Sequence, residues 1–458
     1  MNIIIVLLII IFITIIGFSL ISFFNLLSGF CLLSKIAYSF GLGITLTSFQ
    51  LYVFSRLSIP WTKPDLIIPW LIIIILTLIK NMRNLSMKIP EIPKFKKIDW
   101  ILTLLIIFCI SYAVFEALIR PPVAWDSWAA WLFQSKVFFL SGKIDPGILR
   151  HFNLYYPLLN YLSNTFFFIV MGKVDDTAIL LVSSAFYFFL TILFFDFIKQ
   201  RYGFRRGLLF TFLFVSTQNL IRHGGRMESG LADLPLGFFS FCSVALLFEY
   251  IKSSSRKTLA VLSIFLCSAA LVKSEGLALS IWIGMFAILH IYKNKLYGHL
   301  TFLLLWMVPV IDWEIYKRIS GINNYFLSHS LIFSLSKAKS AFTGTFKELI
   351  NIKSWNVLWI TYFYTLLLKP FKNKELFILN FVIISQLILY VLTYIFTQGN
   401  SPDSSIERLL IHLAPIVMLE IVIFASFIEY KDVVKSISFE NSEVVKFIND
   451  FISRIDGN

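Results

Sequence analysis

The sequence lacks cysteine pairs and the common nucleotide and hydrolase motifs. Its four cysteines stand singly within apolar runs, with no CxxC pair, so neither a disulfide framework nor a zinc site is indicated. The patterns GxxxxGK[ST], HExxH and GxSxG are missing too, which gives no sign of a P-loop, a zinc peptidase or a serine hydrolase. We therefore expect no metal and no other cofactor.

Charge is also scarce. Charged residues make up 14% of the 458 residues, against 58% hydrophobic residues. A water-soluble domain could not keep that much apolar surface out of solvent, so the bilayer must be part of the environment. The net charge of +14 comes mostly from basic residues in short loops between apolar runs, as the positive-inside bias predicts. Membrane topology thus explains the charge without a nucleic-acid partner.

The apolar runs predict an all-α integral membrane protein with about thirteen transmembrane helices. They lie near residues 2–24, 32–54, 65–81, 99–118, 177–198, 206–221, 232–251, 258–272, 276–292, 298–315, 355–368, 375–396 and 408–430. The first run lacks a basic start and a cleavage site, so we expect a retained span. One membrane domain is predicted over residues 1–430, followed by a cytoplasmic tail, 431–458, whose apolar side chains recur at helical spacing.

The basic loops set the predicted orientation in the cell membrane. Basic residues cluster at 80–97, 199–206, 252–257, 293–295 and 369–374, which should all be cytoplasmic. These loops share one side only if the N-terminus faces out and the C-terminus faces the cytoplasm. Residues 157–172 then form an interfacial helix packed against the bundle in the large first outer loop, 119–176, because a further span would place Arg205 and Arg206 outside.

Three more segments then reach the extracytoplasmic face, at 222–231, 316–354 and 397–408, and the turn at 273–275 joins them. The segment 316–354 is basic, against the positive-inside pattern. Either the topology differs there or these cations have an anionic partner.

The richest outer segment is 120–136, in which Trp125, Trp128 and Trp131 recur every third residue. Such a helix would lie at the headgroup level of the bilayer. Asp126 stands among the indoles, and a carboxylate at an apolar edge takes up a proton readily, which suits a general base. Asp126 could instead cap the helix that follows, and the two roles can coexist.

Acids and bases also gather in residues 222–235, with glycines that let the backbone approach a ligand closely. Arg222 and Arg226 are candidate ligands of an anion, although Glu228 and Asp233 could simply pair with them. Asp233 stands at the start of a span, where an unpaired carboxylate is costly.

Two further candidate pairs flank other spans. Lys273 and Glu275 enclose a tight turn and could form a mutual structural pair. Arg408 and His412 lie one helical turn apart at the outer end of the last span. A guanidinium there suits a phosphate, whose oxygens match its forked donors, or it anchors the helix at the interface.

In their order along the chain, these motifs resemble the polytopic glycosyltransferases of the GT-C fold. That group includes protein O-mannosyltransferases and lipid A aminoarabinose transferases. The resemblance covers roughly residues 99–292 and 397–430. It rests on Trp-Asp-Ser-Trp at 125–128, Tyr-Pro-Leu-Leu at 156–159, Ala-Asp-Leu-Pro at 232–235, Lys-Ser-Glu-Gly at 273–276 and Ser-Ile-Glu-Arg-Leu-Leu-Ile-His at 405–412. The chain departs from the family pattern at Ser127, where many members carry a second acid, and at Leu158, where a proline is usual.

The resemblance implies a GT-C-like bundle and a sugar donor carried on a polyprenyl phosphate, with transfer on the outer side. Asp126 would be the general base that deprotonates a glycan, lipid or protein acceptor. Fixed cations would stabilise the charge that develops on the leaving lipid phosphate. The residues expected to bind the donor phosphate or the substrate are Tyr156, Arg222, Arg226, Glu228, Asp233, Lys273, Glu275, Arg408 and His412.

Other functions remain open at this stage. A glycan polymerase or ligase also acts on polyprenyl-linked sugars and would use basic residues of a late outer loop, such as Lys337 and Lys339. A lipid or solute transporter would tend to show related halves and broken helices with polar groups near the midplane. This sequence shows no internal repeat, which favours the enzyme. A structural scaffold would give no reason to gather these ionisable residues on one side.

Overall fold

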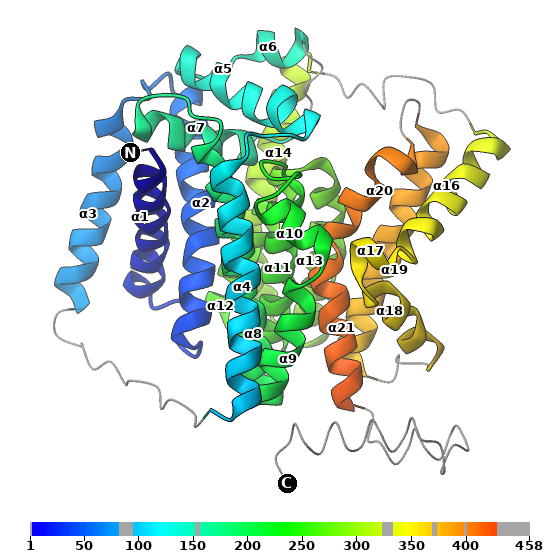
Figure 1. The fold of residues 1–458 in the computed structure, drawn as a ribbon. Coiled ribbons are helices and arrows are strands. Elements are labelled where there is room, and N and C mark those ends of the chain that lie inside the picture. The colour runs from blue at the N-terminus through cyan, green and yellow to red at the C-terminus, as the bar shows by residue number, and fades with distance from the viewer. Residues whose placement is uncertain are drawn as a thin grey trace, which may run out of the picture.

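A computed structural model describes residues 2–81, 95–151, 156–322, 333–368, 373–397 and 401–427. All regular elements of these residues are helices (Figure 1). A helix satisfies its backbone hydrogen bonds internally, so apolar runs can adopt it inside a bilayer. Among the described residues, eight helices are long and apolar enough to cross a membrane, and one bent pair makes a ninth. The chain is therefore a multi-pass membrane protein, and within the residues that the structure describes fewer helices than the thirteen predicted are long and apolar enough to be spans.

The N-terminal third consists of long helices and a set of short ones that covers one end of the bundle (Figure 1). Its elements are α1 (Asn2–Phe23), α2 (Leu32–Arg56), α3 (Lys63–Asn81), α4 (Lys97–Ile119), η1 (Ser127–Leu132), α5 (Phe133–Ser141), α6 (Pro146–His151) and α7 (Leu159–Met171). Helix α7 has only 13 residues and packs against α2 and α5 with almost all of its side chains buried. It is thus enclosed by protein in the large loop where an interfacial helix was expected.

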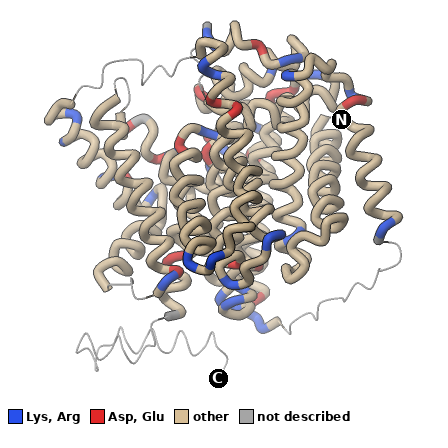
Figure 2. The backbone as a smooth tube through the Cα atoms, turned by 180° about the vertical axis from the view of Figure 1, so that it is seen from behind, with Lys and Arg blue, Asp and Glu red and all other residues tan. Residues whose placement is uncertain are grey.

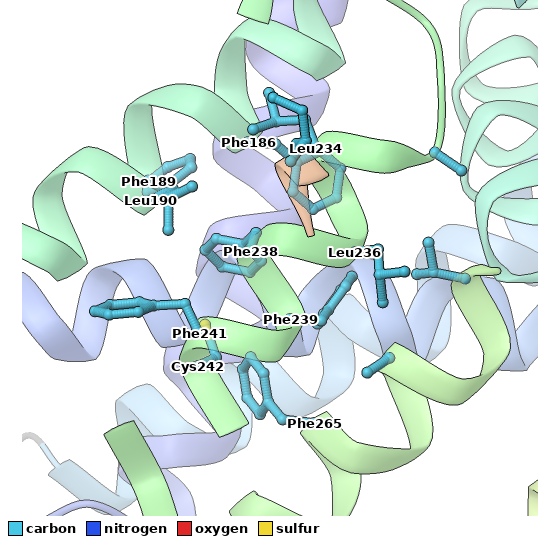
Figure 3. Packing of buried hydrophobic residues seen from close by; sticks show 14 of the residues in the cluster. Phe186, Phe189, Leu190, Leu234, Leu236, Phe238, Phe239, Phe241, Cys242 and Phe265 are labelled. Carbon is cyan, nitrogen blue, oxygen red and sulfur yellow. The ribbon is translucent and has the colours of Figure 1, made fainter. Parts of the chain in front are cut away.

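The central third holds the most buried helices. Its elements are η2 (Ala178–Leu180), α8 (Leu181–Tyr202), α9 (Phe204–Val215), α10 (Gln218–Gly224), α11 (Asp233–Ser253), α12 (Arg256–Val272), α13 (Ser274–Lys293), η3 (Tyr297–Leu303) and α14 (Leu304–Ile319). Phenylalanine rings fill the space between α2, α8, α11 and α12 (Figure 3). The Phe40 and Phe189 rings stack 4.4 Å apart, and the Phe186 and Phe238 rings meet edge to face at 5.5 Å. This aromatic core fixes α11, whose first residue is Asp233.

The C-terminal third contains α16 (Leu335–Leu349), α17 (Ile352–Trp355), α18 (Leu358–Leu367), α19 (Lys374–Phe396), α20 (Pro402–Ile411) and α21 (Ala414–Phe427). The predicted span 408–430 is broken, because α20 and α21 meet at an angle of 53°. Pro415 has no N–H to donate to the carbonyl of Ile411, so the helix cannot continue unbroken. That carbonyl lies over Gly237 of α11, where an added Cβ would be 3.0 Å from its oxygen.

Three other predicted spans are also shorter than expected. The runs 206–221, 258–272 and 355–368 form α9, α12 and α18, of 12, 17 and 10 residues, where about 20 are needed to cross the hydrocarbon core. Helix α9 ends at Val215, and the next helix, α10, begins at Gln218. The predicted tail helix at 431–458 and most of the basic linker after the third span lie outside the described residues.

Charged residues gather at the two ends of the bundle, and the middle is almost free of them (Figure 2). At one end, Arg201 lies 3.1 Å from Glu249 and 2.8 Å from Glu375, and Arg205 lies 3.4 Å from Asp99. These pairs bring together loops that were predicted to share a side. The other end holds α5, α6, α7 and the start of α20 (Figure 1), and we call it the site end.

Candidate functional site

Asp126 immediately precedes η1, a π-helical turn over Ser127–Leu132. Turns of this kind are rare and often mark functional sites. The carboxylate makes no capping hydrogen bond to the turn. Instead it accepts a hydrogen bond from Nη1 of Arg408, in α20, and forms an ion pair with it. The side chain of Asp126 is therefore directed at the last span rather than at its own helix.

Beneath this pair lies a group that we call the Asp233 cluster: Asp233, Lys273, His412 and Tyr390. The Nζ of Lys273 lies 2.7 Å from Oδ1 of Asp233, and Nε2 of His412 donates to the same oxygen at 2.9 Å. Nδ1 of His412 in turn accepts the hydroxyl of Tyr390 at 2.9 Å. Because a buried carboxylate needs charged and hydrogen-bonding partners, these contacts explain how Asp233 is tolerated at the start of α11.

The interruptions of three helical segments bring the Asp233 cluster together. Asp233 begins α11, Lys273 stands in the extended link between α12 and α13, and His412 stands at the break between α20 and α21. At helix interruptions the backbone leaves its regular path, so polar side chains from different helices can meet. The predicted Lys273–Glu275 pair is secondary, since their charged atoms are 3.7 Å apart.

A second ion network ties the segment 222–231 to α20. Arg222 lies 2.8 Å from Oε1 of Glu228 and also pairs with Glu407. Glu407 is the neighbour of Arg408, so two adjacent side chains of α20 are tied to the site end. Among the described residues, Arg226 takes part in no ion pair.

The loop after α10 is held against α4 and η1 by close backbone contacts. A Cβ on Gly225 would lie 1.7 Å from the carbonyl oxygen of Ala113, in α4, so only glycine fits there. Farther along the loop, the hydroxyl of Ser127 donates to the carbonyl of Ser229 at 2.8 Å. Ser127 thus positions the turn beside Asp126, at the place where the resembled family often has a second acid.

His223 lies in α10 and is almost fully buried. Its Nδ1 is 2.9 Å from the carbonyl oxygen of Asn219, and its Nε2 has no hydrogen-bond partner among the described residues. Burial lowers the pKa of His223 from its ordinary value of 6.5, and the carboxylates of Asp233 and Glu228 oppose that effect. The imidazole therefore packs under the site as a neutral group.

Most of the residues singled out from the sequence meet in this region. Tyr156 lies nearby, with its ring 5.1 Å from that of Trp131. Three contributors were missed: Tyr390, Glu407 and Ser229. Glu407 adjoins the predicted Arg408, which was an available signal. Tyr390 lies inside an apolar run, and a single phenol in a span gives no clear signal of its own.

Among the described residues, no group of three or more His, Cys, Asp or Glu side chains is placed to hold a metal ion. No family model matches the chain, and neither curated proteins nor solved structures show a significant match to it.

Proposed function

We propose that the chain is a membrane glycosyltransferase that takes a sugar from a polyprenyl-phosphate donor. The acceptor is a hydroxyl or amine of a glycan, lipid or protein on the extracytoplasmic face of the cell membrane. The observation that supports this most directly is the Arg408–Asp126 pair, which joins the first large loop to the last span above the buried Asp233 cluster. The order of motifs resembling GT-C enzymes supports it as well.

The Arg408–Asp126 pair and the Lys273–Asp233 pair beneath it differ in how easily a ligand can break them. The side chains of Arg408 and Asp126 are 24% and 36% exposed, whereas those of Lys273 and Asp233 are 7% and 1% exposed. A partly solvated ion pair contributes little to stability, about 0–1 kcal/mol, and breaking a buried pair costs several. A phosphate can therefore compete with Asp126 for Arg408, while Lys273 stays paired with the carboxylate of Asp233.

This competition links donor binding to the release of the base. A donor phosphate that takes the guanidinium of Arg408 leaves the carboxylate of Asp126 free to accept a proton. The acceptor oxygen or nitrogen then attacks C1 of the sugar as its proton passes to Asp126. The bond between C1 and the phosphate oxygen breaks, and its electron pair leaves with the polyprenyl phosphate. Arg408 stabilises the charge that appears on that oxygen.

The decisive test of the function is the lipid content of cells that lack this chain. Deletion should leave a polyprenyl phosphate carrying one sugar unused, and mass spectrometry of lipid extracts should detect its accumulation. Wild-type chain supplied in trans should clear it and Asp126→Asn should not. As a matched control, Asp145→Asn should clear it, since the Asp145 carboxylate accepts a hydrogen bond from the nearby Gly147 N–H and forms no ion pair with a described residue. Unchanged polyprenyl lipids in the deletion strain would overturn the proposal.

The extracytoplasmic location has its own test, by cysteine labelling in a background without the four native cysteines. Ser127 is fully buried and is unsuitable, so we choose Val123→Cys and Asp403→Cys at the site end, both exposed. Lys252→Cys and Lys293→Cys report on the other end. An impermeant maleimide added to intact cells should label the first two variants only. The opposite pattern would place the site in the cytoplasm.

A further inference from the structure

Helix α16 belongs to the basic segment whose charge contradicted the positive-inside pattern. It packs against α19 and α20 beside the site end (Figure 1). The Nζ of Lys337 donates to the carbonyl of Thr397, just after α19, at 3.3 Å. This bond fixes the start of α16 next to the end of α19.

An apolar groove of about 320 Å³ runs between α16, α18 and α19. Its walls include Phe342, Phe346 and Leu349 from α16 and Leu387, Val391 and Ile395 from α19. Phe342 and Phe346 are 62% and 61% exposed. Large rings left this open on a membrane protein face lipid, so a hydrocarbon chain is the natural occupant of the groove.

Beside this apolar stripe runs a basic one. Lys339, Thr343 and Lys347 follow one another at intervals of four residues, so they lie along one face of α16. All three are exposed, and neither lysine forms an ion pair with an acid of the described residues.

The one acid of α16, Glu348, is paired with side chains other than the two lysines. Glu348 accepts hydrogen bonds from the indole of Trp355 at 2.8 Å and from the amide of Asn351 at 3.0 Å. It therefore does not neutralise the two lysines, and the exposed edge of α16 keeps its positive charge.

We propose that this groove binds one acyl chain of an anionic phospholipid from the surrounding membrane, with the phosphate held by Lys339 and Lys347. Long lysine side chains reach from an apolar surface to the headgroup level, and each contributes to attraction for an anionic headgroup. The lipid packs α16 onto α19 and supplies the anionic partner that Lys339 and Lys347 lack among the described residues. This inference does not depend on glycosyl transfer.

The test is native mass spectrometry of the full-length protein in detergent, titrated with phosphatidylglycerol or phosphatidylcholine of identical chains. Two lysines predict a preference for phosphatidylglycerol on the order of 30-fold. The double variant Lys339→Gln/Lys347→Gln should bring the two lipids close to parity. Val391→Trp, which fills the groove, should weaken binding of both lipids while the unfolding temperature stays near that of wild type.

The matched control is Lys293→Gln/Lys295→Gln, which removes two exposed lysines at the opposite end and should keep the preference. Equal binding of both lipids by the wild type would overturn the proposal, as would a preference that survives loss of Lys339 and Lys347. One-for-one displacement of phosphatidylglycerol by polyprenyl phosphate would assign the groove to that lipid instead.

Discussion

Arg408 donates to the carboxylate of Asp126 across 282 positions of sequence. The contact joins a π-helical turn in the first large loop to the broken last span. This contact forms the upper of two layers in the site, and the lower layer is the Asp233 cluster, which is almost fully buried. A solvated pair above a buried one gives the site an upper contact that a ligand can exchange and a lower contact that stays in place.

Removal of the buried carboxylate should destabilise the protein more than removal of an exposed one. Asp233→Asn leaves Lys273 buried without its counter-charge, and we expect a loss of about 3–5 kcal/mol. Unfolding in detergent micelles measures it. The comparison is Asp176→Asn, because Asp176 pairs with Lys136 at 2.6 Å but is partly exposed, so that its loss should cost about 0–1 kcal/mol. Equal effects of the two variants would show that the Asp233 cluster is not a structural centre.

The close approach of α10 and α4 gives a second prediction. Gly225→Ala places a methyl group 1.7 Å from a backbone oxygen, so one of the two segments must move. We expect a loss of about 1–3 kcal/mol, together with reduced transfer, because the same loop carries Ser229 beside the Asp126 turn. Gly29→Ala meets nothing within 4 Å and should have the stability and activity of the wild type. If Gly225→Ala also matched the wild type, the loop would not depend on this contact.

His223 should make stability depend on pH. Its pKa is lowered by burial in the folded state, so on acidification the unfolded chain takes up the proton first. The contribution of His223 to the free energy of unfolding is therefore fully present above about pH 6.5. It declines as the pH falls from there toward the folded-state pKa, by up to about 1.4 kcal/mol per pH unit.

The measurement compares unfolding of wild type and His223→Gln between about pH 7.5 and about pH 5. Glutamine keeps a donor for the Asn219 carbonyl but does not titrate, so the variant should lose less stability in acid. Parallel curves for the two proteins would contradict a buried neutral His223.

Much of this arrangement could be predicted from the sequence because membrane insertion requires long apolar runs separated by polar, often basic, loops. Apolar runs located the helices, and basic loops grouped segments that the structure does bring to one end, such as 199–206 and 252–257. Fewer than thirteen helices of the described residues are long and apolar enough to be spans, because a hydropathy pattern does not show where a helix ends. Pro415 was visible, yet the break also depends on Gly237, which has no Cβ and so leaves room for the freed carbonyl of Ile411 from a distant segment.

The pairing of the site residues was harder to predict than their identity. Asp126, Asp233, Lys273, Arg408 and His412 stood out because ionisable residues next to apolar runs are costly. Which of them would pair depends on how helix interruptions meet in space. The sequence therefore suggested Lys273 with Glu275 and left capping open for Asp126, whereas the closest contacts are Lys273 with Asp233 and Asp126 with Arg408.

The role of Asp126 as the general base is tested by single-turnover transfer with Asp126→Asn in membrane vesicles. The donor is the sugar-bearing lipid isolated from the deletion strain. We expect a rate lower by a factor of about 10² to 10⁴, with the unfolding temperature close to that of wild type because the lost ion pair is partly solvated. Transfer at the wild-type rate by a folded Asp126→Asn protein would contradict it.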